Sequence, residues 1–277
     1  MNPIAILTDF GTEDSYVGEM KGVVSGIAPG AALIDITHAI PAGDIQAAAL
    51  TLWRALPAFP PQTIFLVVVD PGVGTARRPL AVRILNRTII APDNGVISYL
   101  LASAEAEEMV EIHNPAILRH SNSQTFHGRD LFSPAAAHVA TGMPLAELGA
   151  VCGDPVQLSM PLLETSEDHI KGEVLHKDHF GNLTTSIGAL TRVSAGIRLE
   201  PWCQPKPGLV FNGNAFSVIL PDQTMLSLHT TFADVARGSG LAYIGSAGLL
   251  EVAVRQGNAA RAFELEPGAK IVLERKE

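Results

Sequence analysis

An uninterrupted apolar run, FLVVV at residues 65–69, restricts the fold more than any other feature of the chain. A strand that is hydrophobic on both faces must be covered on both, as central strands of α/β sheets are. The run ends at Asp70, and the proline and glycines of residues 71–74 predict a tight turn. Because open α/β sheets bind ligands beyond the carboxyl ends of their strands, we expect Asp70 to face a ligand.

Strand and helix patterns alternate along the first half of the chain. Short apolar runs are followed by stretches with apolar residues at helical spacing. Asp44 stands where the N-cap of one helix is expected. The alternation predicts an α/β sandwich domain with a mainly parallel sheet. Strands are expected at residues 4–7, 32–36, 65–69, 80–84 and 88–90, and helices around residues 17–27, 45–56, 97–100 and within 127–142.

The second half has a different pattern. The segment GDPVQLSMPLLETSED, residues 153–168, has prolines and polar residues without a period, as linkers do. Short alternating runs follow it, which predicts an all-β domain with the form of a small barrel. We therefore divide the chain into an N-terminal α/β domain at residues 1–153, a linker at 154–168 and a smaller C-terminal β-barrel domain at 169–277.

Composition excludes several classes of partner. The formal charge of −9 argues against binding of nucleic acid or an anionic membrane surface. Charged residues make up only 17% of the chain, so we expect a homo-oligomer that covers part of the surface. The N-terminus lacks a signal-peptide pattern, and no apolar run reaches the roughly 18 residues that a transmembrane helix needs. We expect a cytoplasmic protein.

Three carboxylates follow or interrupt the predicted strands: Asp9, Asp35 and Asp70. Clustered carboxylates bind hard cations, so a metal site is one interpretation. However, the chain lacks HExxH and paired-histidine spacings, and we expect no catalytic metal. The turn after Asp70 also departs from nucleotide-binding loops, because Arg77 stands where the third glycine of GxGxxG would be.

Two arginines, Arg77 and Arg78, close this turn. They are either solvated charges, or one of them returns to pair with Asp70. An arginine beside an aspartate lowers the pKa of the carboxyl group, which would then orient a water molecule better than deprotonate it.

Two further loops carry chemistry. His127 precedes a predicted helix and lies beside a glycine, which suits a functional histidine better than a structural one. The segment 177–182, KDHFGN, combines an aromatic ring, a glycine and polar side chains. It is either an ordinary turn or a site that recognises a flat ring with polar edges.

Five motifs, in order along nearly the whole chain, resemble the S-adenosyl-L-methionine (SAM) hydroxide adenosyltransferases, which are related to the fluorinase and chlorinase enzymes. The motifs are LTDFG at 7–11, DPGVGTARR at 70–78, APDNG at 91–95, TFHGRD at 125–130 and DHFGN at 178–182. The resemblance implies attack of water or hydroxide on the ribose C5′ of SAM, giving adenosine and L-methionine. It also implies an α/β domain and a β-barrel domain in a homotrimer, with the ligand between two subunits, and SAM as substrate without a cofactor.

In the first domain, the resemblance assigns Asp70, Arg77 and His127 to water activation and Asp9 to the ribose hydroxyls. Of the three, His127 has the ordinary pKa nearest neutrality and is the better candidate for the base, while Asp70 would orient the water or the histidine. The sequence leaves this assignment open.

The remaining substrate contacts implied by the resemblance lie around His127 and in the second domain. Phe126 and Gly128 flank the histidine. Asp178 and Asn182 match residues that hold the methionine end, with Phe180 beside them, and Ser246 falls near a segment that contacts adenine.

The chain departs from its halide-using relatives in an informative way. They have tyrosine and serine at the positions of His127 and Gly128, lack the aspartate and arginine at Asp70 and Arg77, and have a tryptophan at the position of Gly43. These differences favour water over halide as the nucleophile. The alternatives are a non-catalytic sensor of adenosine or SAM, and a metal-dependent nucleoside or phosphate hydrolase.

Overall fold

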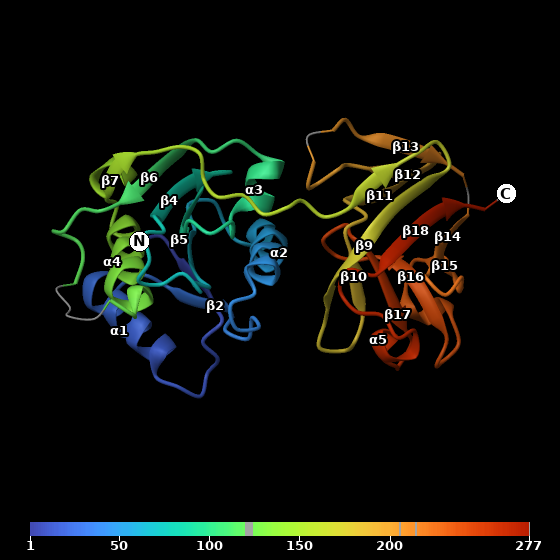
Figure 1. Ribbon diagram of the computed structural model, residues 1–277, viewed down its shortest axis with the longest axis horizontal. Coiled ribbons are helices and arrows are strands. Elements are labelled where there is room, and N and C mark those ends of the chain that lie inside the picture. The colour runs from blue at the N-terminus through green and yellow to red at the C-terminus, as the bar shows by residue number, and fades with distance from the viewer. Residues whose placement is uncertain (120–123, 205, 214, 277) are drawn as a thin grey trace. The chain divides into compact units, whose positions relative to one another are not determined.

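The computed structural model describes residues 1–119, 124–204, 206–213 and 215–276, and its chain forms two compact units, residues 1–158 and 159–277 (Figure 1). The predicted linker, residues 154–168, spans the division between them. Each unit has its own sheets.

The first unit is built on one seven-stranded sheet in the order β2-β1-β3-β5-β4-β6-β7. The pairings from β2 to β5 are parallel, and the three beyond β5 are antiparallel. The strands are β1 (Ile4–Thr8), β2 (Leu33–Thr37), β3 (Ile64–Val68), β4 (Pro79–Ile84), β5 (Arg87–Pro92), β6 (Glu108–Ile112) and β7 (Gly149–Val151).

This sheet is mixed, whereas the sequence predicted a mainly parallel one. The reason is the hairpin between β4 and β5, whose two-residue loop is Leu85-Asn86. Both loop residues have positive φ, 51° and 56°, as a type I′ turn requires. A two-residue loop can join only antiparallel strands. The loop lacks the Asn-Gly or Asp-Gly pair that usually announces such a turn.

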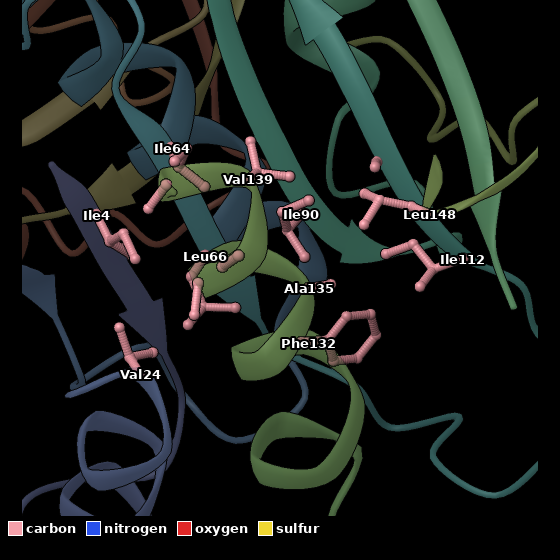
Figure 2. Close-up of a cluster of buried hydrophobic side chains, with 14 of the residues drawn as sticks. Ile4, Val24, Ile64, Leu66, Ile90, Ile112, Phe132, Ala135, Val139 and Leu148 are labelled. Atoms are coloured by element: carbon pink, nitrogen blue, oxygen red, sulfur yellow. The ribbon is translucent and has the colours of Figure 1, made fainter. Parts of the chain in front are cut away.

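Helices cover both faces of the sheet. On one face, α1 (Tyr16–Ile27) and α4 (Ser133–Ala140) contribute to a buried cluster. Figure 2 shows part of this cluster, including Val24 of α1 and Val139 of α4. On the other face, α2 (Ile45–Ala55) and α3 (Ser98–Ser103) pack over alternate residues of the same strands. Single turns of 3₁₀-helix lie at Leu56–Ala58 and Leu145–Glu147.

The central strand β3 is covered as its sequence requires. Phe65 and Val67 belong to the cluster under α2, and Leu66 and Val68 to the cluster under α1 and α4. The start of α2 is also as predicted. The Asp44 carboxylate accepts a hydrogen bond from the Ala47 N–H at 2.9 Å and caps the helix. That N-cap prediction is confirmed.

The second unit is almost entirely strand. In the described part of this unit, β10 pairs with both β17 and β9, which closes a seven-stranded barrel in the order β10-β17-β16-β15-β14-β18-β9. The short β8 extends beside β9, and β11, β12 and β13 form a separate sheet. Closure pairs the strand edges that an open sheet would expose. The predicted barrel is confirmed.

The elements of the second unit are short. They are β8 (Leu163–Thr165), β9 (His169–Lys177), β10 (Leu183–Thr185), β11 (Leu190–Val193), β12 (Gly196–Leu199), β13 (Leu209–Asn212), β14 (Phe216–Ile219), β15 (Met225–His229), a 3₁₀ turn (Phe232–Asp234), β16 (Gly240–Ile244), β17 (Leu250–Val254), α5 (Ala259–Ala262) and β18 (Lys270–Arg275). In neither unit do the described residues include a helix of the length and apolarity that crossing a membrane would demand.

Candidate active site

The first element of the site is the turn that follows β3. Val69 is fully buried, and the Asp70 side chain is only 5% exposed. The turn is held by its own polar groups: the Thr75 N–H and hydroxyl both donate to the Gly72 carbonyl, at 3.1 and 2.7 Å, and the Arg77 N–H donates to the Thr75 hydroxyl at 3.3 Å. These bonds reverse the chain and return Arg77 to Asp70.

Arg77 donates hydrogen bonds to the Asp70 carboxylate from two of its nitrogens. Nε lies 2.9 Å from Oδ1 and 3.0 Å from Oδ2, and Nη2 donates to Oδ2. The guanidinium group also lies over the Phe132 ring, 5.1 Å from its centroid. Both charged side chains are more than 90% buried, so water screens this pair little. Of the two arginines at the turn, Arg77 is therefore the one that pairs with Asp70.

The same guanidinium orients His127. Arg77 Nη2 lies 2.7 Å from His127 Nδ1. A guanidinium group has no acceptor, so Nδ1 must accept and must be unprotonated. Burial, and then the positive charge of Arg77, hold the pKa of His127 below its ordinary 6.5, although Asp70 opposes them. The neutral imidazole therefore carries its proton on Nε2.

This tautomer changes what His127 can do. With its proton on Nε2, the imidazole presents a hydrogen-bond donor rather than the free lone pair of a base. Asp70 Oδ1 accepts one hydrogen bond, from Arg77 Nε, and a carboxylate oxygen has two lone pairs. In this arrangement the group that can accept a proton from water is thus Asp70. The sequence had favoured His127 as the base.

The chain around His127 is tightly packed. Gly128 begins a turn of π-helix, Gly128–Phe132, which leads into α4. A Cβ atom on Gly128 would lie 3.1 Å from the Phe126 ring and 3.2 Å from Met20 Sδ. Phe126 packs edge-to-face on Phe10, with 5.9 Å between ring centroids. Two predicted contact residues, Phe126 and Gly128, thus lie directly beside the histidine.

Asp9 lies at the same edge of the sheet as Asp70. It follows β1 as Asp70 follows β3, and those two strands are parallel neighbours with Thr8 opposite Val68. Asp9 Oδ2 accepts a hydrogen bond from the Gly43 N–H at 2.8 Å. Gly43 has φ +72°, a conformation that favours glycine. One carboxylate oxygen of Asp9 is thus held by backbone.

The third carboxylate that the sequence singled out lies within β2 and forms ion pairs there. Asp35 Oδ2 lies 2.6 Å from Lys21 Nζ, and Oδ1 lies 3.1 Å from His38 Nε2. The buried His38 in turn hydrogen-bonds through Nδ1 to the Thr8 hydroxyl at 2.8 Å. Over the ranges that the structure describes, no three Asp, Glu, His or Cys side chains are grouped to hold a metal ion. Asp35 therefore supports the strand behind Asp9.

In the second unit, Asp178, Phe180 and Asn182 share the turn between β9 and β10. Asp178 Oδ1 accepts from the Phe180 and Asn182 N–H groups at 2.9 and 2.8 Å, and Oδ2 accepts from Asn182 Nδ2 at 2.9 Å. These bonds hold the turn rigid, as an Asx turn does. Phe180 is left 72% exposed.

A pocket of about 820 Å³ adjoins this turn. Its walls combine two aromatic rings, Phe180 and Phe232, with the polar side chains of Asn182 and Arg255. Sequence reasoning missed Phe232, because its loop has neither a period nor a motif. Ser246, in the turn between β16 and β17, is exposed and is absent from the residues that line this pocket.

Comparisons with known proteins cover both units. Two family models match: the SAM hydroxide adenosyltransferase N-terminal domain over residues 4–149 and its C-terminal domain over residues 172–272. An (R)-S-adenosyl-L-methionine hydrolase of Thermus thermophilus is 40% identical, over 99% of this chain and 100% of that protein. One from Salinispora arenicola is 36% identical, over 97% and 96%.

More distant relatives and solved structures agree with this. A fluorinase of an Actinoplanes species is 29% identical over 98% of this chain and 97% of its own. A crystal structure of an uncharacterized conserved protein from Thermotoga maritima has a TM-score of 0.86 at 34% identity, covering 98% of this chain and 100% of that one. A conserved hypothetical protein from Thermus thermophilus has a TM-score of 0.75 at 35% identity, covering 99% and 100%.

Proposed function

This chain belongs to the SAM hydroxide adenosyltransferase family, and from that premise we propose that it hydrolyses S-adenosyl-L-methionine to adenosine and L-methionine. The observation that carries the assignment is the contact of Asp70, Arg77 and His127 in a desolvated site at the carboxyl end of β3. These three residues differ from the residues that the halide-using relatives place there. Water is therefore the proposed nucleophile.

The proposed reaction is a single in-line displacement. The water oxygen forms a bond to the ribose C5′ as the C5′–S bond breaks, and the sulfonium sulfur leaves with its electron pair as the neutral thioether of methionine. The leaving group needs no proton, so the enzyme needs no general acid. We propose that no metal or cofactor takes part besides the substrate.

Asp70 is the proposed acceptor of the proton that water loses. Of the three groups it alone offers an unprotonated lone pair, since Arg77 only donates and His127 carries its proton on Nε2. A carboxylate is a weak base. A weak base suffices here, because the oxygen becomes strongly acidic as its bond to carbon forms. The His127 Nε2–H group would hold the same oxygen in line.

The other contacts follow from shape and charge. The Asp9 carboxylate suits two neighbouring ribose hydroxyls, which can donate to it together. The pocket between Phe180 and Phe232 suits the flat adenine ring. Asn182, which also lines the pocket, is assigned by the resemblance to the methionine end together with Asp178. Asp178 supplies a negative charge for the methionine ammonium group. The contact of Ser246 with adenine and the active homotrimer stay proposals from the resemblance. A cytoplasmic location stays a proposal from the sequence.

The test is to incubate the purified protein with SAM and a chelator, with and without chloride, and to separate the products by chromatography. We expect adenosine and methionine in equal amounts. Asp70→Asn should lower kcat by about a hundredfold or more, because the amide neither accepts the proton nor pairs with Arg77 as an ion. Asp222→Asn, at an exposed turn of the second unit, is the control and should stay within about twofold of the wild type.

Three results would contradict the proposal. Tight binding of SAM without turnover would indicate a sensor. Activity that disappears in chelator and returns with a divalent ion would indicate a metallohydrolase. A 5′-halogenated nucleoside formed in chloride would show that the site around His127 accepts halide.

A further inference from the structure

One turn of the first unit forms hydrogen bonds next to both members of the proposed catalytic pair, Asp70 and Arg77. This turn, Asp93-Asn94-Gly95, joins β5 to α3 and is called the DNG turn below. Val69, which precedes Asp70, hydrogen-bonds to Asn94, and Arg78, which follows Arg77, hydrogen-bonds to Asp93. The residues of this turn belong to the sequence motif APDNG, and the proposed chemistry uses none of them.

Asn94 completes the hydrogen bonding at the end of β3. Its Nδ2 donates to the carbonyl of the fully buried Val69 at 2.8 Å. The Thr88 N–H of β5 donates to the Thr63 carbonyl at 3.1 Å, and in the same parallel register the N–H of residue 94 would donate to the Val69 carbonyl. The Asn94 N–H donates instead to the Pro92 carbonyl at 3.0 Å. The side-chain amide of Asn94 supplies the missing donor.

The orientation of this amide is set by the turn itself. Asn94 Oδ1 accepts from the Val96 N–H at 3.2 Å, so the opposite end of the amide, Nδ2, faces Val69. The glycine of the turn is required: Gly95 has φ +99°, and a Cβ there would lie 2.9 Å from the Leu158 side chain. The DNG turn is therefore a rigid element.

Asp93 holds the other end of the catalytic turn. Its side chain is 4% exposed, and its Oδ2 accepts from Arg78 Nε at 2.8 Å. Its Oδ1 accepts from the Val156 N–H at 2.8 Å. The Arg78 guanidinium group also donates to the carbonyls of Gly153 and Asp154, at 3.1 and 2.9 Å. Arg78 is thus fixed through both its backbone and its side chain.

We propose that the DNG turn positions the catalytic pair, with Asn94 as a positioning residue for Asp70 and Asp93 for Arg77. Asn94 binds the carbonyl of Val69, the residue directly before Asp70. Asp93 binds the side chain of Arg78, the residue directly after Arg77. One rigid element therefore sets the distance across which Arg77 reaches Asp70 and His127. The inference rests on the proposed function.

The experiment compares two asparagines that make the same pair of hydrogen bonds. Asn114 Nδ2 donates to the Glu147 carbonyl at 2.7 Å, and its Oδ1 accepts from the Ala116 N–H at 2.9 Å, as Asn94 does with its own partners. Asn94→Ala should lower kcat for SAM at least about tenfold with KM within about twofold. Asn114→Ala should leave both constants within about twofold.

A second variant isolates the bond to Val69. Asn94→Asp keeps the acceptor toward Val96 but replaces the donor with a carboxylate oxygen that faces the Val69 carbonyl, so it should lower kcat at least as much as Asn94→Ala does. The NMR titration of His127 is a second measurement, because a loss of stability alone would not change it. Arg77 is ion-paired with Asp70, so when Asn94→Ala lets Asp70 shift, Arg77 should move with it and away from His127. The pKa of His127 should then rise toward its ordinary value, and it should stay unchanged in Asn114→Ala.

Either of two outcomes overturns the inference: an unchanged kcat in both Asn94 variants, or a lower kcat with an unchanged His127 titration. Failure of the proposed function is recognised separately, because the wild-type protein would then not turn over SAM. The His127 titration would still decide whether Asn94 positions the set.

Discussion

At the scale of single residues, Arg77 determines the chemistry of both its partners. It offers only donors, so the two atoms that face it, the carboxylate of Asp70 and Nδ1 of His127, must both accept. This requirement fixes the charge of one partner and the tautomer of the other. A lysine could not do the same, because a single ammonium group lacks the planar fork that reaches two partners.

The pH dependence of turnover follows from this contact. Protonation of His127 would place a hydrogen on Nδ1, facing the Arg77 guanidinium group, and would break the hydrogen bond between them. Since the pKa of His127 is lowered from 6.5, chiefly by burial and then by Arg77, kcat/KM should be constant above about pH 6.5 and fall below it. The measurement is a pH–rate profile with SAM.

His127→Asn provides the comparison, since the Asn oxygen can still accept from Arg77 but does not titrate. The variant should be slower at every pH and should lose the acid limb that His127 causes. Stability should follow the same sign. The unfolded chain binds this proton more readily than the native protein, so the stabilising contribution is complete above pH 6.5 and is lost as the pH falls toward the folded pKa. An acid limb that persists unchanged in His127→Asn would contradict the assignment.

At the scale of elements, the site depends on where strands and helices begin and end. Asp9 and Asp70 leave two parallel neighbouring strands at the same edge, as ligand-binding residues of open α/β sheets do. The loop before α2 brings the Gly43 N–H to Asp9, and Asp44 caps the helix directly after it. The helix cap therefore fixes the loop that holds Asp9.

Asp44→Ala should cost about 1 kcal/mol of the free energy of unfolding, because the Ala47 N–H would lose its partner. Urea unfolding at neutral pH measures it. Ser15→Ala is a matched control: Ser15 is the N-cap residue of α1, but its side chain makes no capping hydrogen bond and donates to Glu19 instead. That variant should lie within about 0.5 kcal/mol of the wild type. Equal losses in both variants would refute the capping role of Asp44.

At the scale of the whole molecule, the proposed chemistry and the proposed adenine pocket lie in different units of the chain. Asp70 belongs to the unit at residues 1–158, and Phe180 to the unit at residues 159–277. In the proposed homotrimer, a complete site can then draw its two halves from different subunits.

Co-expression of two inactive variants tests this arrangement. Asp70→Asn should disable only the first half of a site, and Phe180→Asp, which places a charge at the wall of the pocket, only the second. In mixed trimers about a quarter of the sites would combine two intact halves, since each half is intact with a probability of one half. Activity of the mixture should reach about that fraction of the wild type, and each variant alone should show almost none. Inactive mixed trimers would mean that each site is built within one subunit.

The sequence by itself determined those features that depend on neighbours along the chain. The uninterrupted apolar run at 65–69 predicted a strand covered on both faces. The position of Asp44 predicted a helix N-cap, and the alternating runs of the second half predicted a barrel. Hydrophobic periodicity and capping act over a few residues, so the sequence carries them directly. The family resemblance added the candidate set, but not its distances.

Only the tertiary structure decided what depends on contacts between distant residues. Arg77 and His127 are fifty positions apart, and the protonated nitrogen of the imidazole follows from their contact. Tertiary packing also determines that Arg78 pairs with Asp93 and that Asp35 pairs with Lys21. It places Phe232 at the wall of a pocket. The physical reason is that a hydrogen bond or an ion pair depends on atoms that meet within a few ångströms, and folding, rather than position along the chain, determines which atoms meet.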